Sequence, residues 1–485
     1  MLNRTTHELI FIRICVIFLS CAPLFYIVFL PLPLAALALS LELAYYLFIL
    51  RRFKTRLAGQ ADHPPDTRQE REALFQRCLQ NIPDPERYLS LWAHGADPAE
   101  IKRENLREFF LWAFFDRQHD CPDDADIQDE LEGYITGTEA LLGRTLAPGR
   151  GSARSLRLTF DDIPTRYRCL LWYLIVALVD SATHLRMLRR GFHFYAAPAP
   201  HASVFHVFPP RPLVSMRWPD RRFSAGELNY WYRPAATTAT TGGSTTRPVV
   251  FLHGIGIGLY PYVPFLNDLP PTSPVLAVEI LPISMRLTKT NILARPDFVR
   301  QLKAILHQHG IDCFVLISHS YGSILTTHVL RDSELGPQVE GVVLVDPVSL
   351  LLHLPDVAYN FTRRMPTFAN EWQLWYMASM DPGIALVLGR HFFWRENIIW
   401  KDELVSRGPL GQRRAAVCLA SRDLIVDTLT VGRYLELAVA LGSGTANTTT
   451  ASGVELLWFD LDHAQVFDKR QDYGRILDVV RRFCA

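Results

Sequence analysis

The sequence predicts an α/β protein with a mostly parallel sheet flanked by helices, preceded by a membrane-anchoring and a helical N-terminal region. With 485 residues the chain is too long for a single core, so two or three folding units are expected. After Pro248, short apolar runs of strand length alternate with helical segments, which indicates a parallel sheet with helices on both faces. Before it, residues 9–50 are apolar almost without interruption.

The expected strands of the C-terminal part span residues 249–252, 275–280, 314–317, 342–345, 415–419 and 454–459. Helical segments lie between them, for example at residues 297–309 and 323–331. In sheets of this kind, functional groups gather at the carboxyl ends of the strands. The loops that follow these strands are therefore where chemistry is expected.

Residues 350–410 interrupt this alternation and predict a helical lid over the site. The segment is rich in large side chains, namely Trp372, Trp375, Tyr376, Met377, Phe392, Phe393 and Trp394. Two interpretations stay open. These side chains form the ordinary core of a helical insertion, or some of them face inward and line an apolar pocket.

Composition excludes some classes of partner. A hydrophobic content of 49% with 20% charged residues is typical of a globular chain, and a net charge of +1 gives no sign of nucleic-acid binding. The eight cysteines are irregularly spaced, so neither a disulfide framework nor a zinc site is expected.

The apolar stretch 9–50 predicts a membrane anchor. As one straight helix it would be about 60 Å long, twice the hydrocarbon core of a bilayer. Pro31 and Pro33 break it into halves of about 22 and about 17 residues, of which the second can barely cross. Glu42 in the second half is costly in lipid, and it faces the partner helix or lies at the interface. A cleaved signal peptide after Arg4 is the competing interpretation, but the apolar residues continue far beyond any such site.

Basic residues set the expected orientation. Arg51, Arg52, Lys54 and Arg56 directly follow the apolar stretch, and positive charge at a span end favours the cytosolic side. Residues 1–60 are thus expected to anchor the chain by one or two spans, with the remainder in the cytosol. The sequences at Asn360 and Asn447 match the acceptor pattern for N-glycosylation, which matters only for a lumenal domain.

Residues 61–209 form a helical N-terminal region in this prediction. Apolar residues recur at helical spacing over 71–79 and 101–115. The apolar run 170–179 has about ten residues, too few to cross a bilayer, and predicts a buried or membrane-lying helix. The third unit, residues 210–485, is the expected catalytic domain.

A nucleophile is expected at Ser320. Residues 318–322 read Ser-His-Ser-Tyr-Gly and lie between the strand 314–317 and a helix, which is the context of a G-x-S-x-G elbow. The leading position is Ser318 instead of glycine, a departure that a small side chain tolerates. The tight turn would expose the Ser320 hydroxyl at the top of the sheet.

A serine hydroxyl needs a base that a carboxylate orients. His463 follows the last expected strand and is the predicted base. Asp423, at the end of the strand 415–419, is the predicted acid, and the chain order Ser, Asp, His is the one this elbow requires. Asp346, after the strand 342–345, and Asp427 are the alternatives for the acid.

A glycine-rich loop, His253 to Gly258, follows the first strand. Its glycine spacing does not fit a dinucleotide-binding loop, and no helix-forming stretch follows. Glycine also lets a backbone N–H approach a developing oxyanion. The N–H groups of Tyr321 and Ile255 are the predicted oxyanion donors, and neither a cofactor nor a metal is implied.

By the order and context of these motifs, residues 210–485 resemble the α/β-hydrolase superfamily. Three segments, 101–105, 112–115 and 318–322, further resemble a group of fungal α/β-hydrolase-domain proteins with hydrophobic N-termini. The superfamily resemblance implies cleavage of an ester, thioester or amide, or acyl transfer, through an acyl-enzyme. A serine at position 320 argues against the dehalogenase and epoxide-hydrolase branches, whose nucleophile is an aspartate.

The expected function is that of a serine hydrolase that cleaves a small-molecule carboxylic ester, apolar or lipid-like, through Ser320, His463 and Asp423. Two alternatives remain: a membrane-anchored acyltransferase, and a non-catalytic adaptor that uses the α/β-hydrolase fold. An intact Ser, Asp, His order favours an enzyme, because a binding protein has no need of it.

Overall fold

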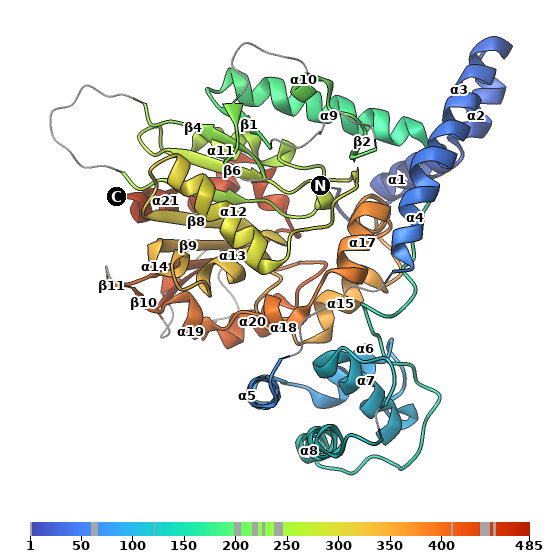
Figure 1. Ribbon diagram of the computed structural model, residues 1–485, viewed down its shortest axis with the longest axis vertical. Coiled ribbons are helices and arrows are strands. Elements are labelled where there is room, and N and C mark those ends of the chain that lie inside the picture. The colour runs from blue at the N-terminus through green and yellow to red at the C-terminus, as the bar shows by residue number, and fades with distance from the viewer. Residues whose placement is uncertain are drawn as a thin grey trace.

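The computed structural model describes residues 2–59, 66–120, 122–197, 205–215, 222–225, 228–236, 246–408, 411–436, 447–449 and 453–485. A large sheet forms its centre (Figure 1). Its strands are β1 (His193–Ala196), β3 (Arg222–Phe223), β4 (Asn229–Arg233), β5 (Val249–Leu252), β6 (Val275–Glu279), β8 (Phe314–His319), β9 (Val339–Val345), β12 (Arg414–Ala420), β13 (Asn447–Thr449) and β14 (Val454–Phe459). They lie in the order β13-β14-β12-β9-β8-β5-β6-β4-β1-β3.

The central strands, from β14 to β6, are parallel, while β4 and β13 pair antiparallel at either side of them. Alternate side chains of a strand point to opposite faces. Val249 and Phe251 accordingly belong to the core on one face, and Val250 and Leu252 to the core on the other. Strands buried on both faces have continuous apolar runs, which is why each expected strand coincides with an observed one. The predicted fold class is confirmed.

Helices cover both faces of the sheet. α11 (Val263–Asp268) and α21 (Arg470–Cys484) share the core of Val249 and Phe251. α12 (Arg295–Gln308) and α13 (Gly322–Leu330) share the core on the opposite face. The smaller elements of this part are β2 (Val207–Phe208), α10 (Pro212–Ser215), β7 (Leu287–Thr288), α14 (Leu335–Gln338), β10 (Arg407–Gly408), β11 (Gly411–Gln412) and α20 (Thr428–Tyr434).

The insertion expected at residues 350–410 lies between β9 and β12 and is helical. It contains α15 (Pro355–Thr362), α16 (Ala369–Leu374), η5 (Trp375–Ser379), α17 (Pro382–Arg390), α18 (Trp394–Asn397) and α19 (Lys401–Leu404). We call it the lid insertion. It lies at the carboxyl edge of the parallel strands, where the loops after β8, β12 and β14 also meet.

A group of helices packs beside the lid insertion (Figure 1). It comprises α5 (Arg68–Leu79), α6 (Pro85–Trp92), α7 (Arg103–Phe115) and α8 (Ala125–Leu142). Its centre is aromatic: the rings of Phe75 and Tyr134 stack at 4.2 Å, and Phe114 lies 5.4 Å from Trp394 of the lid insertion. Arg87 pairs with Asp356, and Arg395 with Asp116, so these helices brace the insertion.

The N-terminal apolar stretch forms α1 (Thr6–Ser20), α2 (Ala22–Phe29), α3 (Leu32–Tyr45), η1 (Tyr46–Leu50) and α4 (Arg51–Leu57). The break between α2 and α3 lies at Pro31, as predicted. The first half is not one straight segment, because α1 and α2 are bent by 77°. Pro23 in the first turn of α2 lacks the N–H that a continuing helix needs.

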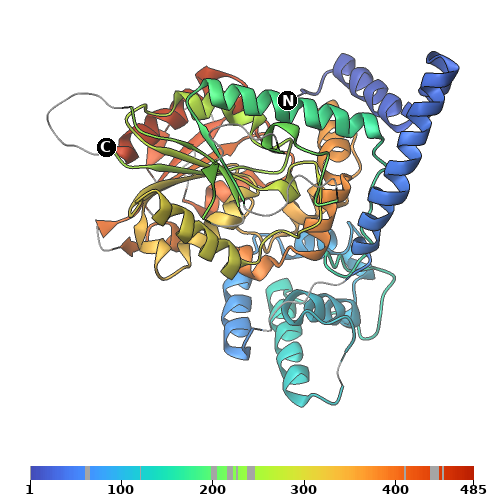
Figure 2. The same cartoon turned by 45° about the horizontal axis from the view of Figure 1, so that its top comes forward.

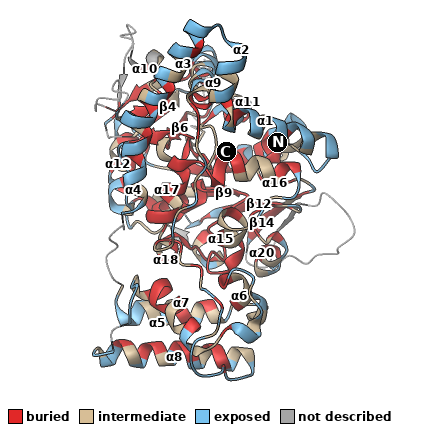
Figure 3. Cartoon of the chain, turned by 90° about the vertical axis from the view of Figure 1, so that its right-hand side faces the viewer, coloured by how far each residue is buried: buried red, intermediate tan, exposed pale blue. Residues whose placement is uncertain are grey.

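In the part of the chain that the structure describes, two helices are long and apolar enough to cross a membrane: the continuous helix Leu32–Leu57, formed by α3, η1 and α4, and α9 (Leu170–Arg189). The bent pair α1 and α2 would be a third candidate if it acts as one span. Figure 3 shows that α2 and α3 expose most of their surface, whereas the sheet is buried.

The helix α9 is twice as long as the apolar run that predicted it. It lies along the body of the molecule, beside β1, and meets α3 at its N-terminus (Figures 1 and 2). Asp180 in its middle forms ion pairs with Arg211 and Arg286. These ion pairs fix α9 on the body of the molecule. The helix is only partly buried and is itself a candidate span by length and composition, so the expectation of a buried or membrane-lying helix stays a prediction.

Glu42 faces the start of α9 and not the other half of the apolar stretch, while the expectation that the second half lies in the membrane interface stays a prediction. Its carboxylate accepts hydrogen bonds from the Tyr167 hydroxyl and from the backbone N–H of Leu170, at the start of α9. A carboxylate at a helix N-terminus interacts favourably with the helix dipole. Glu42 therefore docks α3 onto the rest of the molecule at the start of α9.

The sheet begins before residue 210, because β1 (His193–Ala196) is one of its strands. The boundary expected near residue 60 lies outside the described residues. The three-part division stays a prediction.

Candidate active site

Ser320 lies in a sharp turn between β8 and α13. Its φ is +50°, and its backbone N–H donates to the Val345 carbonyl at 2.9 Å. A non-glycine residue in the left-handed region is strained, and this strain aims the side chain out of the sheet. Ser318, the departure from the glycine pattern, is buried, and its hydroxyl accepts a hydrogen bond from Thr326 of α13 at 2.8 Å. The serine therefore fits the elbow and ties it to the helix.

Two glycines make the close packing around Ser320 possible. A Cβ atom on Gly322 would lie 2.3 Å from the Leu252 carbonyl oxygen, and one on Gly254 would lie 2.8 Å from the Cβ of Ser320. Real Cβ atoms do not approach so closely. Both positions require glycine so that the loop after β5 can lie against the nucleophile turn.

The structure brings Ser320, His463 and Asp423 into one hydrogen-bonded chain. His463 Nε2 lies 2.9 Å from Ser320 Oγ, and His463 Nδ1 lies 2.7 Å from Asp423 Oδ2. The other oxygen of Asp423 accepts from the backbone N–H groups of Ile425, at 2.7 Å, and Val426, at 3.0 Å. The carboxylate is thereby fixed with one oxygen toward the imidazole. This geometry is that of a nucleophile, a base and an orienting acid.

The two alternative acids have other partners. Asp427 caps α20, and its carboxylate accepts from the Thr430 N–H at 3.1 Å. Asp346 ends β9 with φ of +44° and is buried beside the histidine. Its oxygens accept from the backbone N–H groups of Ala420, at 3.1 Å, and Ala464, at 2.8 Å. Neither of them contacts His463 Nδ1, so the geometry assigns that bond to Asp423.

The charges around His463 favour its protonated form. Burial by itself would lower the pKa of His463, but the carboxylates of Asp423, Asp346 and Asp462 outweigh it and raise that pKa to about 9. Burial raises the pKa of Asp346 to about 7; the Asp423 carboxylate adds to this rise, and the charge on His463 opposes it. The protonation states of His463 and Asp346 therefore depend on each other.

Asp346, Asp423 and His463 are also close enough to hold a metal ion, since one ligand atom of each lies within 4.8 Å of the others. These atoms are already engaged. The Asp423 oxygen and His463 Nδ1 bond to each other, and both oxygens of Asp346 accept from backbone N–H groups. The donor set fits a hydrogen-bonded relay better than a cation site.

Histidines of the glycine-rich loop and the elbow have structural partners. His253 Nε2 accepts from the Ile280 N–H at 2.9 Å, which fixes the loop after β5 to the loop after β6. The Tyr262 hydroxyl lies 2.8 Å from His319 Nδ1 and accepts from the Gly254 N–H at 3.3 Å. Burial, with the charges of His463 and His253, holds the pKa of His319 well below its usual value, so this ring is neutral.

The predicted oxyanion donors lie in the loop and the elbow. Tyr321 follows Ser320 at the start of α13, and Ile255 follows Gly254. Among the described residues, neither backbone N–H donates a hydrogen bond. Both are available to an oxygen bound next to Ser320, and their role as oxyanion donors stays a prediction.

Sequence reasoning missed how the lid insertion is held at the site. Asn370 of α16 donates to Asp462, next to the base, and the Leu2 N–H donates to Gln373 of the same helix at 2.9 Å. The helix α1 packs along α16, with Arg13 over the ring of Trp372. These contacts join residues that are between 92 and 371 positions apart, and no local pattern predicts them.

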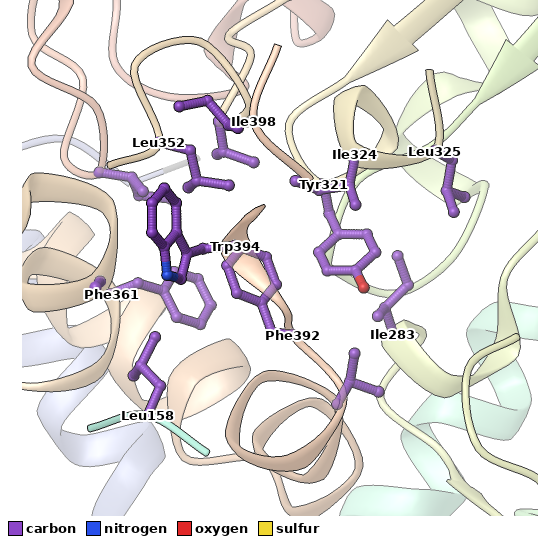
Figure 4. Packing of buried hydrophobic residues seen from close by; sticks show 14 of the residues in the cluster. Leu158, Ile283, Tyr321, Ile324, Leu325, Leu352, Phe361, Phe392, Trp394 and Ile398 are labelled. Carbon is purple, nitrogen blue, oxygen red and sulfur yellow. The ribbon is translucent and has the colours of Figure 1, made fainter. Parts of the chain in front are cut away.

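An apolar cluster lies between the elbow and the lid insertion. Figure 4 shows Tyr321, Ile324 and Ile283 on one side of it, with Phe392 and Trp394 opposite. The ring centroids of Tyr321 and Phe392 are 6.2 Å apart. Trp394 also contacts Phe114 of α7, and Tyr376 packs against Trp172 of α9 instead. Phe392 is thus an aromatic residue of the lid insertion whose ring contacts the elbow, at Tyr321.

The strand order and the elbow define an α/β-hydrolase fold. No protein-family model matches the chain, and no curated protein sequence is similar to it. Solved structures with some likeness include a 2-hydroxy-6-oxo-6-phenylhexa-2,4-dienoate hydrolase from Rhodococcus, at 17% identity and a TM-score of 0.36 over 54% of this chain and 97% of that one. A haloalkane dehalogenase from Agrobacterium tumefaciens has 13% identity and a TM-score of 0.35, covering 53% of this chain and 94% of that one. A bacterial membrane phospholipase A has 13% identity and a TM-score of 0.37, covering 64% and 94%. At such values we draw nothing on activity or substrate from them, and the resemblance to fungal proteins stays a prediction.

Proposed function

We propose that this chain is a serine hydrolase that cleaves carboxylic esters with an apolar acyl group. The observation that carries the proposal is the chain of hydrogen bonds from Ser320 Oγ through His463 to Asp423, at 2.9 Å and 2.7 Å. A binding protein gains nothing from a serine held in a strained turn against an imidazole that a carboxylate orients.

In this proposal Ser320 Oγ attacks the carbonyl carbon of the ester while His463 Nε2 takes the hydroxyl proton. The resulting oxyanion accepts from the N–H groups of Tyr321 and Ile255, and one such donor is worth about 3 kcal/mol in comparable enzymes. Collapse of the intermediate breaks the ester bond, and His463 gives the proton to the leaving alcohol. Water, deprotonated by His463, then releases the acid and regenerates Ser320.

The apolar acyl group is inferred from the side chains beside the elbow. Tyr321, the residue after the nucleophile, packs with Ile283, Ile324 and Phe392 in a buried cluster that is apolar apart from the tyrosine hydroxyl. Ser320 is 5% exposed, so an ester reaches its hydroxyl only if a neighbouring segment moves, and we infer that this segment is the lid insertion. Movement that uncovers apolar side chains is favoured where lipid or detergent can cover them.

Membrane attachment is part of the proposal. The helix Leu32–Leu57 is long and apolar enough to cross, and its exposed basic residues Arg51, Arg52 and Lys54 favour the cytosolic side at that end. The catalytic domain would then lie in the cytosol, next to the membrane that holds its substrate.

A fluorophosphonate probe tests the proposal, because it reacts only with activated serines. The wild-type chain should be labelled, Ser320→Ala should not, and Ser152→Ala, an exposed serine of a distant loop, should be labelled normally. Absence of labelling in the wild-type chain, with a normal thermal melt, would favour the non-catalytic adaptor. Labelling that survives in Ser320→Ala would place the nucleophile elsewhere.

A further inference from the structure

A pocket lies where the N-terminal helix meets the catalytic body, away from Ser320. It has a volume of about 290 Å³ and lies between η1 and α4 on one side and the segments around β2 and β7 on the other. Its polar side chains are Arg52, Arg56, His206, Thr288 and Lys289. Its apolar side chains are Phe48, Ile49, Phe53, Phe205, Phe208 and Leu287.

Among the described residues, the cations of this pocket have no carboxylate partner. Arg56 donates to the Thr288 carbonyl and to the Asn291 side chain, both of them neutral acceptors. Arg52 lies over the ring of Phe205 at 5.6 Å, and neither Arg52 nor Lys289 forms an ion pair within the described part of the chain. No acidic residue lines the pocket. Three positive charges thus converge on one cavity without a negative charge to balance them, an arrangement that favours an anion.

A buried polar atom points to the same conclusion. His206 lines the pocket, and its Nδ1 atom is buried without a hydrogen-bond partner among the described residues. Buried polar atoms are almost always satisfied, so such an atom in a cationic cavity suggests a ligand that completes it.

The pocket also lies at the border between apolar and basic surface on the helix Leu32–Leu57. Phe48, 54% exposed, is among the last of its exposed apolar side chains, and exposed Arg51 and Arg52 follow within one turn. Phe205, across the pocket, is also 54% exposed. An occupant therefore meets cations at one end and apolar rings at the other, which is the polarity of a lipid.

We propose that this pocket binds the phosphate-bearing headgroup of an anionic lipid, with Arg52, Arg56 and Lys289 as its cationic partners. The occupant is a lipid rather than free phosphate because Phe48 and Phe205 would cover the first carbons of its chains. The site would fix the depth and rotation of the catalytic body against the membrane. It deepens the membrane attachment in the proposed function but does not depend on catalysis by Ser320.

The test uses the full-length protein in a neutral detergent and short-chain lipids as probes. Dihexanoyl phosphatidic acid should raise the melting temperature in a saturable manner. Dihexanoyl phosphatidylcholine, with the same chains and no net charge, and inorganic phosphate, with no chains, should each have little effect. Equal stabilisation by phosphatidylcholine, or by phosphate alone, would overturn the proposal.

A double variant, Arg52→Gln with Lys289→Gln, removes two cations that form no ion pair with the described residues. Its loss of the contact between Arg52 and the exposed Phe205 ring is a small one, so the fold should persist. Its affinity for the phosphatidic acid probe should fall about 30-fold, at about fivefold per charge. The matched control, Arg51→Gln with Lys54→Gln, removes two exposed cations that do not line the pocket and should bind as the wild type does. A loss of the same size in the control would show diffuse attraction instead of a site.

Fluorophosphonate labelling of each variant checks that the catalytic body is folded. Binding of dihexanoyl phosphatidic acid should persist in Ser320→Ala. If labelling fails in the wild type while lipid binding persists, the catalytic proposal fails alone. If fluorophosphonate labelling is normal and the double variant binds dihexanoyl phosphatidic acid as tightly as the wild type does, the lipid site fails alone.

Discussion

The Oδ2 atom of Asp346 accepts a hydrogen bond of 2.8 Å from the backbone N–H of Ala464, the residue next to the base His463. Its other oxygen accepts from the Ala420 N–H at 3.1 Å, at the end of the strand that leads to Asp423. One buried carboxylate thus links the two loops that carry the proposed base and acid. Asp346 is a positioning residue, and its charge lies close enough to His463 to change its pKa.

The first prediction concerns the acid. Asp423→Asn should lower kcat by about 10⁴-fold, as loss of the orienting carboxylate does in a Ser-His-Asp triad, because an amide disfavours the required tautomer of His463. Hydrolysis of a p-nitrophenyl ester measures it, and the thermal melt should change little.

Asp427→Asn is the matched control for this experiment. Asp427 caps α20, and asparagine caps a helix about as well as aspartate, so this change should alter both stability and activity little. A loss of kcat at Asp346 as large as that expected at Asp423 would instead move the acid to the neighbouring strand.

The second prediction concerns pH. Only neutral His463 can accept the proton of Ser320, so kcat/KM should rise with pH and reach half its plateau near the His463 pKa of about 9. At that pH Asp346, with a pKa of about 7, is ionised and stabilises the protonated imidazole. Asp346→Asn removes this charge and should shift the half-maximal kcat/KM to lower pH.

The measurement is kcat/KM from about pH 6 to about pH 10 for both proteins. The shift separates an electrostatic role of Asp346 from a purely structural one, because a structural defect would lower the plateau without moving the curve. An unchanged midpoint, or one at higher pH, would contradict the assignment.

The third prediction concerns the acyl chain. If the cluster beside Tyr321 and Phe392 receives the acyl group, kcat/KM should rise from acetate to medium-chain p-nitrophenyl esters. Each buried methylene contributes about 0.8 kcal/mol at most, or roughly fourfold. Phe392→Ala should flatten this dependence, while Phe393→Ala should leave it largely unchanged. A clear preference for acetate in the wild type would exclude the apolar substrate.

The fold was accessible from sequence because its strands are buried on both faces. The runs at 249–252 and 454–459 coincide with β5 and β14 to the residue; the first is wholly apolar, and the second is interrupted only by Glu455. The length of α9 was underestimated because its second half carries the charged residues Asp180 and Arg186. The sequence does not show that Arg211 and Arg286 neutralise Asp180. The strand β1 joins the sheet by pairing with β4. No local pattern in the sequence predicts that these two strands pair.

The candidate site, too, could be predicted only in part from the sequence. Ser320 was readable from its strand and turn, and the order of Asp423 and His463 follows from the fold, although their roles stay predictions. The two contacts of Asp346, the bond from Asn370 to Asp462 and the packing of α1 on α16 were not readable. Each depends on which loops the sheet brings together, and spacing along the chain does not encode that.

The last prediction concerns the membrane. If the helix Leu32–Leu57 anchors the chain, the protein should stay in the membrane pellet after alkaline carbonate extraction. If Arg51, Arg52 and Lys54 lie on the cytosolic side, protease added to sealed vesicles should digest the catalytic domain, and glycosidase should not change the mobility of the chain. The structure adds an argument at Asn360, whose side chain donates to the Ile425 carbonyl at 3.0 Å, a bond that a glycan would break. The double variant Asn360→Gln with Asn447→Gln is the control, since it should migrate as the wild type does. Release by carbonate would refute the anchor, and a faster-migrating double variant would place the catalytic domain in the lumen.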